Sequence, residues 1–368
     1  MNRIILGAIV IVGVLVIAST ILIQEPEPAQ PNEKIGLVVN TPSQYTSLQD
    51  LDQIYLTAAE TGIGRSNVYL FWDKVEPVRG EFDWEHSDIL LSFNKKNSLD
   101  VTLYFSVING RMLGPFPDWI GNPSLNAIND DHLFNVLNAI LSRYDIIDTV
   151  IIAGQTESHF RYSEYDIPIY KELFADMYER LKDAHPDVKI GNTFALHNVL
   201  NKNLNHIVTE LAMGDFVGFT YFPVDSLNDI VKTPTEAIRD LQGSLELVPD
   251  KKSGFLEVGW STSDFVGGSE SDQMEFVRNI LEFYSANEDQ IEFLTWYRQY
   301  DRLDGTCMVD PQPVDGLDIE IGGSSGLGSS EHVIERLGHY VCKSGIISDD
   351  GIPKPGWHEF QTRLKAAG

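Results

Sequence analysis

Two glutamates at the ends of apolar runs are the residues of this sequence best suited to chemistry. Glu257 lies in "GFLEVGWST" (254–262), and Glu157 ends the similar run "VIIAGQTES" (150–158). An ionised carboxylate in an apolar run costs free energy unless it is paired, hydrogen-bonded or exposed. Two carboxyl groups that differ in protonation could act together, one as a nucleophile or base and the other as a proton donor. That chemistry requires a fold that brings the two together.

Eight short apolar runs from residue 34 onward predict buried strands, and segments with helical periodicity separate them. The runs are 34–40, 66–72, 101–107, 149–154, 188–194, 215–222, 254–260 and 291–297. Eight such units favour a closed (β/α)8 TIM barrel. The alternative, an open doubly wound sheet, would be expected to carry a Gly-rich phosphate turn after its first strand. Because active-site residues of a barrel come from the C-terminal ends of its strands, both glutamates could reach one mouth.

The composition and charge limit the kinds of molecule that the chain can bind. At 368 residues, with 43% apolar residues, it can bury a sizeable core. The formal charge of −27 excludes nucleic acid as a partner, because little here would neutralise phosphates.

The first residues predict a membrane anchor. Residues 4–23 hold no charge and are long enough to cross a bilayer as a helix. Arg3 precedes them and Glu25 and Glu27 follow, which places the N-terminus inside and the rest of the chain outside the cell. A cleaved signal peptide, giving a secreted protein, is the alternative. The domains expected are therefore an anchor or signal segment (1–23), a linker (24–33) and a barrel (34–368).

The two cysteines, Cys307 and Cys342, can form one disulfide outside the cell, although an unpaired thiol stays possible. No His/Cys spacing typical of a metal site occurs, so no cofactor is expected. The long acidic loop 301–330 is expected to form part of the rim of the mouth. A calcium site in this loop is a weaker alternative.

Several segments resemble the clan A glycoside hydrolases. "WDKVEPVRGEFDW" (72–84) resembles the segment after their second strand. "DFVGFTYFPV" (215–224) and "LEVGWST" (256–262) are most similar to the endo-β-1,4-galactanase family. "SGIISDDGIPKPGWHEFQ" (344–361) resembles the closing strand and helix of these barrels. The resemblance covers most of residues 34–366 and implies a (β/α)8 barrel that hydrolyses O-glycosidic bonds.

The resemblance also implies roles for single residues. Glu257 matches the nucleophile and Glu157 the acid/base. Tyr221 matches a tyrosine that hydrogen-bonds the nucleophile, and Trp296 matches the aromatic floor of the sugar site.

The sequence departs from this pattern beside the acid. The family usually has Asn-Glu at the end of the fourth strand, with the Asn holding a sugar hydroxyl. Here Gln155 and Thr156 precede Glu157, and we expect both to contact the substrate.

Other residues at the strand ends are candidates for sugar binding. Aromatic rings could stack on the apolar faces of a sugar, although strand-end aromatics are as often plain core; they are Trp72, Trp119, Trp260 and Tyr297. Asn109 follows the third strand on the same side. The sequence therefore supports two hypotheses about function. The first is a monomeric retaining β-glycosidase acting on an extracellular polysaccharide or glycoconjugate. The alternative is a catalytically inactive carbohydrate-binding barrel.

Overall fold

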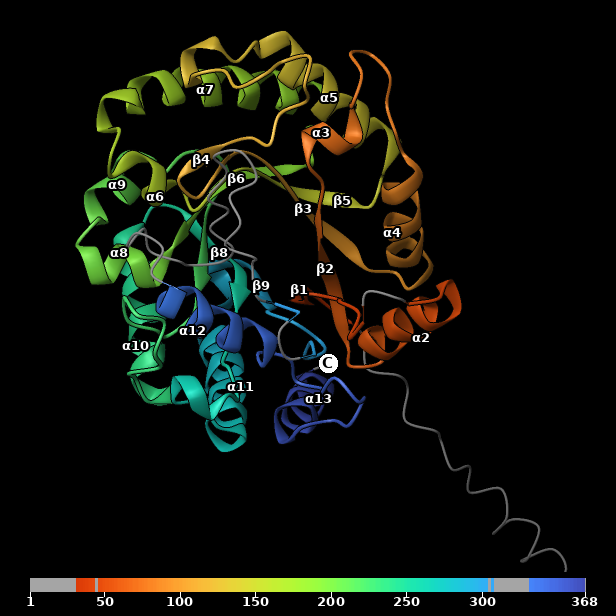
Figure 1. Ribbon diagram of the computed structural model, residues 1–368, viewed down its shortest axis with the longest axis vertical. Coiled ribbons are helices and arrows are strands. Elements are labelled where there is room, and N and C mark those ends of the chain that lie inside the picture. The colour runs from red at the N-terminus through yellow and green to blue at the C-terminus, as the bar shows by residue number, and fades with distance from the viewer. Residues whose placement is uncertain (1–30, 44–45, 304–305, 308–330, 368) are drawn as a thin grey trace, which may run out of the picture.

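Eight parallel strands form a closed barrel, as the sequence predicts (Figure 1). The computed structural model describes residues 31–43, 46–303, 306–307 and 331–367. The barrel strands, in order, are β1 (Asn32–Leu37), β2 (Ile63–Tyr69), β3 (Asp100–Asn109), β5 (Ile147–Gly154), β6 (Lys189–Ala195), β7 (Phe216–Tyr221), β8 (Lys252–Val258) and β9 (Ile291–Trp296). Pairing between β2 and β3 closes the barrel, and the two-residue strand β4 (Met112–Leu113) pairs with β3 antiparallel.

Helices surround the barrel and bury its outer face. The longer ones are α2 (Leu48–Ala59), α4 (Glu85–Lys96), α5 (Asp130–Arg143), α7 (Ile167–Ala184), α10 (Pro234–Leu247), α11 (Glu270–Ala286) and α13 (Pro355–Ala367). Side-chain caps fix where several of them begin. In α10, Thr233 and Glu236 form a reciprocal capping box, and Pro234 occupies the first turn.

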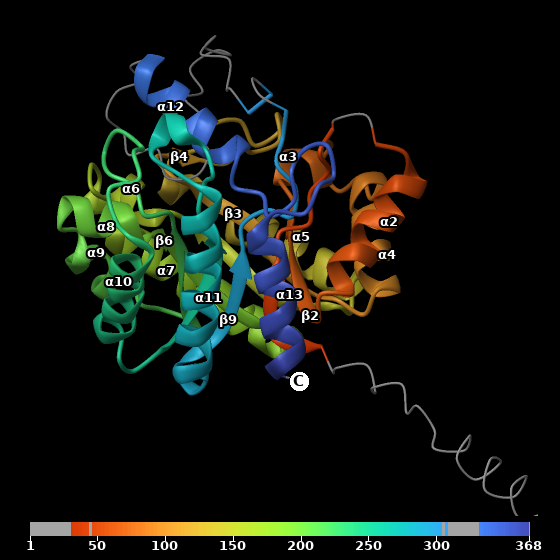
Figure 2. The same ribbon diagram turned by 90° about the horizontal axis from the view of Figure 1, so that it is seen from below.

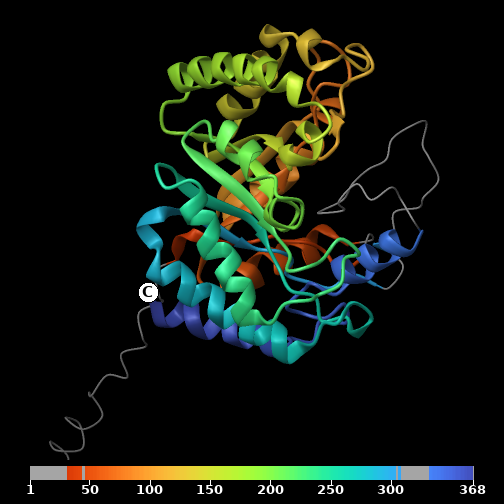
Figure 3. The ribbon, with the colours of Figure 1, turned by 90° about the vertical axis from the view of Figure 1, so that its left-hand side faces the viewer.

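Shorter helices lie in the loops that follow the strands. They are α3 (Trp72–Val75), α6 (Thr156–Phe160), α8 (Leu196–Lys202) and α9 (Asn205–Glu210), with α12 (Glu331–Cys342) after the last strand. Figure 2 shows α12 at the end of the molecule toward which β9 runs, and Figure 3 shows it projecting beside the strand ends. The C-terminal ends of the strands therefore open toward α12.

Side chains of the strands alternate between two cores. An inner cluster inside the barrel contains Tyr104, Ile151, Phe216, Leu256 and Phe293. The larger outer cluster lies between the strands and the helices. Because successive strand residues point to opposite faces, membership of a cluster shows which way each position faces.

A β-bulge in β8 breaks this alternation beside Glu257. Phe255 and Val258 both belong to the outer core, and two residues, Leu256 and Glu257, separate them. Against β7, the pairing advances from Phe219↔Phe255 to Thr220↔Glu257, so β8 gains one residue. Such a bulge lets two consecutive side chains face the same side. Leu256 and Glu257 thus both point into the barrel.

The N-terminal predictions largely fall outside the described residues. Segment 1–23 lies there, as does most of the expected linker, and β1 begins at Asn32, within the range assigned to that linker. In the part of the chain that the structure describes, no helix is long and apolar enough to cross a membrane.

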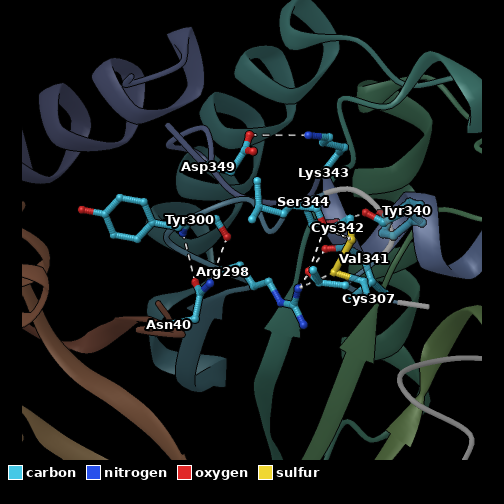
Figure 4. Close-up of a disulfide and its surroundings, with 12 residues drawn as sticks. Asn40, Arg298, Tyr300, Cys307, Tyr340, Val341, Cys342, Lys343, Ser344 and Asp349 are labelled. Atoms are coloured by element: carbon cyan, nitrogen blue, oxygen red, sulfur yellow. Dashed lines mark hydrogen bonds and ion pairs between the residues drawn. A yellow bond between two sulfur atoms is a disulfide. The ribbon is translucent and has the colours of Figure 1, made fainter. Parts of the chain in front are cut away.

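Cys307 and Cys342 form a disulfide (Figure 4). Their Cα atoms lie 5.5 Å apart, and the bond joins the segment after β9 to the last residue of α12. It therefore holds α12 against the mouth of the barrel. Most of the predicted rim loop 301–330 lies outside the described residues.

Candidate active site

Glu257 faces the barrel mouth and is held by a tyrosine from the opposite side. Its side chain is half-buried, and the Tyr69 hydroxyl, at the end of β2, donates a hydrogen bond to its Oε1 atom. Two strands, β9 and β1, separate β8 from β2, so this bond crosses the interior. Asn67, two residues earlier on β2, donates to the Leu256 carbonyl oxygen at 2.6 Å. Strand β2 thus fixes both the bulge and the carboxylate that it exposes.

Burial and polar neighbours act in opposite directions on Glu257. Burial raises the pKa of its carboxyl group, whereas the hydrogen bond from Tyr69 and the positive charge of Arg298 lower it. Burial is the largest effect, so the pKa of Glu257 is raised, as is that of Glu157. The two lowering contributions favour the ionised form, which is the form that can attack an anomeric carbon.

Glu157 lies past the end of β5, in the first turn of the short helix α6. Its side chain is 0% exposed and accepts three hydrogen bonds. The Ser158 hydroxyl and the Asn198 amide donate to Oε1 at 2.8 and 3.3 Å, and the Ala195 N–H donates to Oε2 at 3.0 Å. Glu157 is therefore tied to the end of the neighbouring strand β6 and to α8.

The protonation of Glu157 reflects this enclosure. Burial raises the pKa of its carboxyl group, and the hydrogen bonds from Ala195, Ser158 and Asn198 oppose that rise. A raised pKa suits a residue that donates a proton. Full burial behind three donors suits equally a carboxylate that holds the loop in place.

Tyr104 lies close to both glutamates. Burial raises the pKa of the Tyr104 hydroxyl, and the charges of Glu257 and Glu157 raise it further. Its ring centroid lies 5.6 Å from that of Tyr69, the partner of Glu257. A Cβ atom on Gly154 would lie 1.9 Å from the Tyr104 hydroxyl, so glycine is required where β5 passes this ring. Both carboxyl groups thus lie near Tyr104, at the same end of the barrel.

The expected roles of Tyr221 and Trp296 are wrong. The Tyr221 hydroxyl donates to Asp240 of α10 at 2.6 Å, so it does not bond Glu257. Trp296 is 0% exposed and packs against Phe276 of α11 at 6.0 Å. Both belong to the outer core because the alternation in β7 and β9 turns Thr220 and Thr295 inward instead.

Two further tryptophans proposed for stacking are also buried. Trp72 is 3% exposed and donates through Nε1 to Glu76 at 2.9 Å. Trp260 is 1% exposed and packs 5.1 Å from the Phe276 ring. Neither presents a ring face to a ligand, so their assignment as sugar platforms is wrong in this structure.

The polar candidates lie near the mouth with different access. Asn109, half-buried at the end of β3, accepts a hydrogen bond from the Tyr104 hydroxyl at 2.8 Å. Thr156 is fully buried, and its hydroxyl donates to the Thr193 carbonyl at 3.3 Å. Gln155 adopts a left-handed conformation (φ 50°), and its buried Oε1 atom accepts no hydrogen bond from the described residues. A strained residue with an unpaired polar atom marks this turn as a place for a ligand contact.

Sequence reasoning missed Tyr69, Tyr104 and Arg298. Tyr69 and Arg298 sit at or just after the C-terminal ends of β2 and β9, so the rule that located the glutamates also applies to them. The inward direction of Tyr69 follows from its spacing of two from Asn67, although nothing in the sequence marks which face is inner.

Away from the mouth, the described part of the chain holds a cavity but no metal-ligand cluster. No cluster of three His, Cys, Asp or Glu side chains that could hold a metal ion occurs in the described ranges. A cavity of about 530 Å³ lies among β1, α11 and α13, lined in part by Asn32, Ala286 and Ala366. These residues start β1 and end the two helices, so that cavity opens at the opposite end of the barrel.

Solved structures of similar shape are glycoside hydrolases. No family model matches the sequence. A GH5_18 protein from Bifidobacterium longum subsp. longum ATCC 55813, crystallised with Manb1-4GlcNAc, superposes with a TM-score of 0.64 at 14% identity, over 91% of this chain and 78% of its own. Xylanase 10B from Thermotoga maritima superposes with a TM-score of 0.60 at 14% identity, over 91% and 95%.

A psychrophilic glycoside hydrolase family 10 endo-beta-1,4-xylanase gives a TM-score of 0.59 at 13% identity, over 89% of this chain and 96% of its own. At these identities the likeness shows the fold. The chain is a (β/α)8 barrel of the shape that these hydrolases share.

Proposed function

We propose that this protein is a glycoside hydrolase that cleaves O-glycosidic bonds with retention, and that Glu257 is its nucleophile. The observation that carries the proposal is the bulge-directed, half-buried carboxylate of Glu257, held by Tyr69 at the barrel mouth. A nucleophile must be ionised and fixed, and a hydroxyl donor favours the ionised form. The resemblance of 256–262 to the galactanase family and the barrel shape support the same assignment.

Glu157 is the acid/base in this proposal. Its raised pKa and its location near Tyr104, at the same end of the barrel as Glu257, support that role. To reach a glycosidic oxygen, its side chain must leave the Ala195 N–H and Asn198 amide when substrate binds. Hydrogen bonds in a free enzyme often rearrange in the substrate complex, so this requirement is compatible with catalysis.

The test uses aryl glycosides and separate Glu257→Ala and Glu157→Ala variants. Azide should rescue both: the Glu257 variant should yield a glycosyl azide of inverted configuration, and the Glu157 variant one of retained configuration. Glu164→Ala, in the exposed part of the same loop, serves as the control. An inactive wild type across a broad panel of glycosides would contradict the proposal.

The burial of Glu157 favours a second candidate, a carbohydrate-binding barrel without turnover. A fully enclosed carboxylate with three donors needs no catalytic role to explain it. Glycan-array binding by the wild type, with no hydrolysis of the glycans bound, would support this candidate over the first.

The substrate is proposed to be an extracellular polysaccharide or glycoconjugate. The uncharged segment 4–23 supports a membrane anchor with the barrel outside the cell, or a signal peptide of a secreted protein. The Cys307–Cys342 disulfide supports an oxidising compartment. Alkylation of the protein from its native source, before and after reduction, would test that compartment.

A further inference from the structure

Arg298 lies just after β9 with its guanidinium at the mouth of the barrel. Its backbone is left-handed (φ 77°), a conformation that a non-glycine residue adopts only where the surroundings impose it. The guanidinium lies 4.9 Å from the Tyr297 ring centroid, and Nη1 donates to the Val341 carbonyl at 3.1 Å. Figure 4 shows the side chain directed toward Val341 and the disulfide. The Val341 carbonyl, near the end of α12, thus accepts from one of the five N–H donors of the Arg298 guanidinium.

Arg302 lies four residues further on, beside the same disulfide. Its backbone N–H donates to the Cys342 carbonyl at 3.0 Å. Its side chain is half-buried, and its Nε atom is buried without a hydrogen-bond partner among the described residues. A buried donor without an acceptor costs free energy, and binding of a ligand that supplies an acceptor would remove this cost.

Among the described residues, no carboxylate forms an ion pair with either arginine, although the formal charge of the protein is −27. The pKa of Arg302 is lowered by burial and by the charge of Arg298. The charge of Arg298 also lowers the pKa of Glu257, so Arg298 links Arg302 to the mouth that holds the proposed nucleophile.

We propose that Arg298 and Arg302 form a subsite for an anionic group, a carboxylate or a sulfate ester, carried by the saccharide that reaches Glu257. The inference rests on the proposed function and names the substrate class: acidic rather than neutral saccharides. A guanidinium presents planar donors that match carboxylate and sulfate oxygens. A hydroxyl of a neutral sugar could accept from the Arg302 Nε donor, but only an anion would also offset the repulsion between the two arginines.

The test measures binding apart from hydrolysis. Glu257→Gln, which cannot form the covalent intermediate, is titrated by NMR with glucuronate and glucose, and with galactose 6-sulfate and galactose. We expect at least one acidic member to bind ten-fold or more tightly than its neutral counterpart at low ionic strength. The two pairs separate a carboxylate subsite from a sulfate subsite. Arg302→Gln, added to Glu257→Gln, should remove the preference, and Arg302→Lys should retain part of it.

Arg180→Gln is the matched control, because it removes the same charge on α7, outside the mouth, where Arg180 pairs with Asp131 and Asp176. Thermal unfolding of each variant shows whether it is folded. Equal binding of acidic and neutral saccharides by the folded Glu257→Gln protein, or an equal loss of preference in Arg180→Gln, would overturn the subsite. If the binding preference depends on Arg302 but the wild type hydrolyses no glycoside, the subsite is upheld and the glycosidase is refuted.

Discussion

Tyr69 donates its hydroxyl to Glu257 across the interior of the barrel, from the end of β2 to the end of β8. The sequence resemblance had assigned this contact to Tyr221, which instead donates to Asp240 outside the barrel. The carboxylate is thus supported from a strand on the other side of the mouth. Four predictions test this contact and the elements around it.

Tyr69→Phe should lower kcat/KM on aryl glycosides roughly ten- to hundred-fold, since a hydrogen bond to a charged group contributes about 1.5–3 kcal/mol. The hydrogen bond from Tyr69 lowers the pKa of Glu257, so its removal should raise that pKa. The acidic limb of the kcat/KM profile should then move to higher pH. Tyr178→Phe, which loses a hydroxyl bond to Asp215, is the control. An unmoved acidic limb would argue against Tyr69 as the support of the nucleophile.

Glu157→Gln should lower the free energy of unfolding by about 1–3 kcal/mol, because its amide nitrogen would face a hydrogen-bond donor. All three contacts of Glu157, from Ser158, Asn198 and Ala195, are donated to it. Urea denaturation measures this cost. If Glu157 is also the acid, kcat should fall far more for poor leaving groups than for activated ones. If Glu157→Gln keeps the free energy of unfolding of the wild type, and its kcat changes equally for poor and activated leaving groups, Glu157 has neither role.

Lys354→Met should destabilise the fold by about 3–5 kcal/mol at pH 8, because it leaves the buried Asp301 carboxylate without its cation. Lys354 donates to Asp301 at 2.8 Å, and their side chains are 5% and 3% exposed. Burial raises the pKa of Asp301 to about 6, so at pH 5 the carboxyl group is largely protonated. The cost of the substitution should therefore be smaller at pH 5 than at pH 8.

Urea denaturation of Lys354→Met at the two pH values measures this difference. The exposed pair of Lys96 with Asp52 supplies the control, since Lys96→Met should cost less than about 1 kcal/mol at both. An equal cost of Lys354→Met at pH 5 and pH 8 would contradict a titrating Asp301.

Reduction of the Cys307–Cys342 disulfide should lower the free energy of unfolding by about 3–4 kcal/mol, given the 35-residue separation of the two cysteines. Because Arg298 also contacts Cys307 Sγ and the Val341 carbonyl, reduction should weaken binding of acidic saccharides too. Dithiothreitol acts on this bond alone, since the chain has two cysteines. The Cys307→Ser/Cys342→Ser double variant should have the stability and binding of the reduced protein, and dithiothreitol should change neither.

The sequence was sufficient to predict the barrel and the strands that carry the glutamates. Apolar runs separated by helical segments gave all eight barrel strands, with boundaries displaced by a few residues. The inward or outward direction of single strand residues was harder to predict. Tyr221 and Trp296 end their strands on the outer face, and a position at a strand end does not distinguish the two faces.

The direction of Glu257 depends on the β-bulge, which pairing with β7 and β9 defines. A bulge reflects the register of three strands, so the pattern of one strand alone cannot reveal it. The enclosure of Glu157 likewise depends on Ala195 and Asn198, which follow in sequence by about forty residues and meet it only in the fold.

The extra residue in β8 places a second inward side chain, Leu256, beside Glu257. Loss of Leu256 alone would restore regular alternation, with Phe255 and Val258 facing the helices and Glu257 between them facing the interior. A single-codon deletion could therefore straighten the strand and leave this carboxylate at the mouth, while it removes one side chain from the inner cluster and the carbonyl that Asn67 bonds.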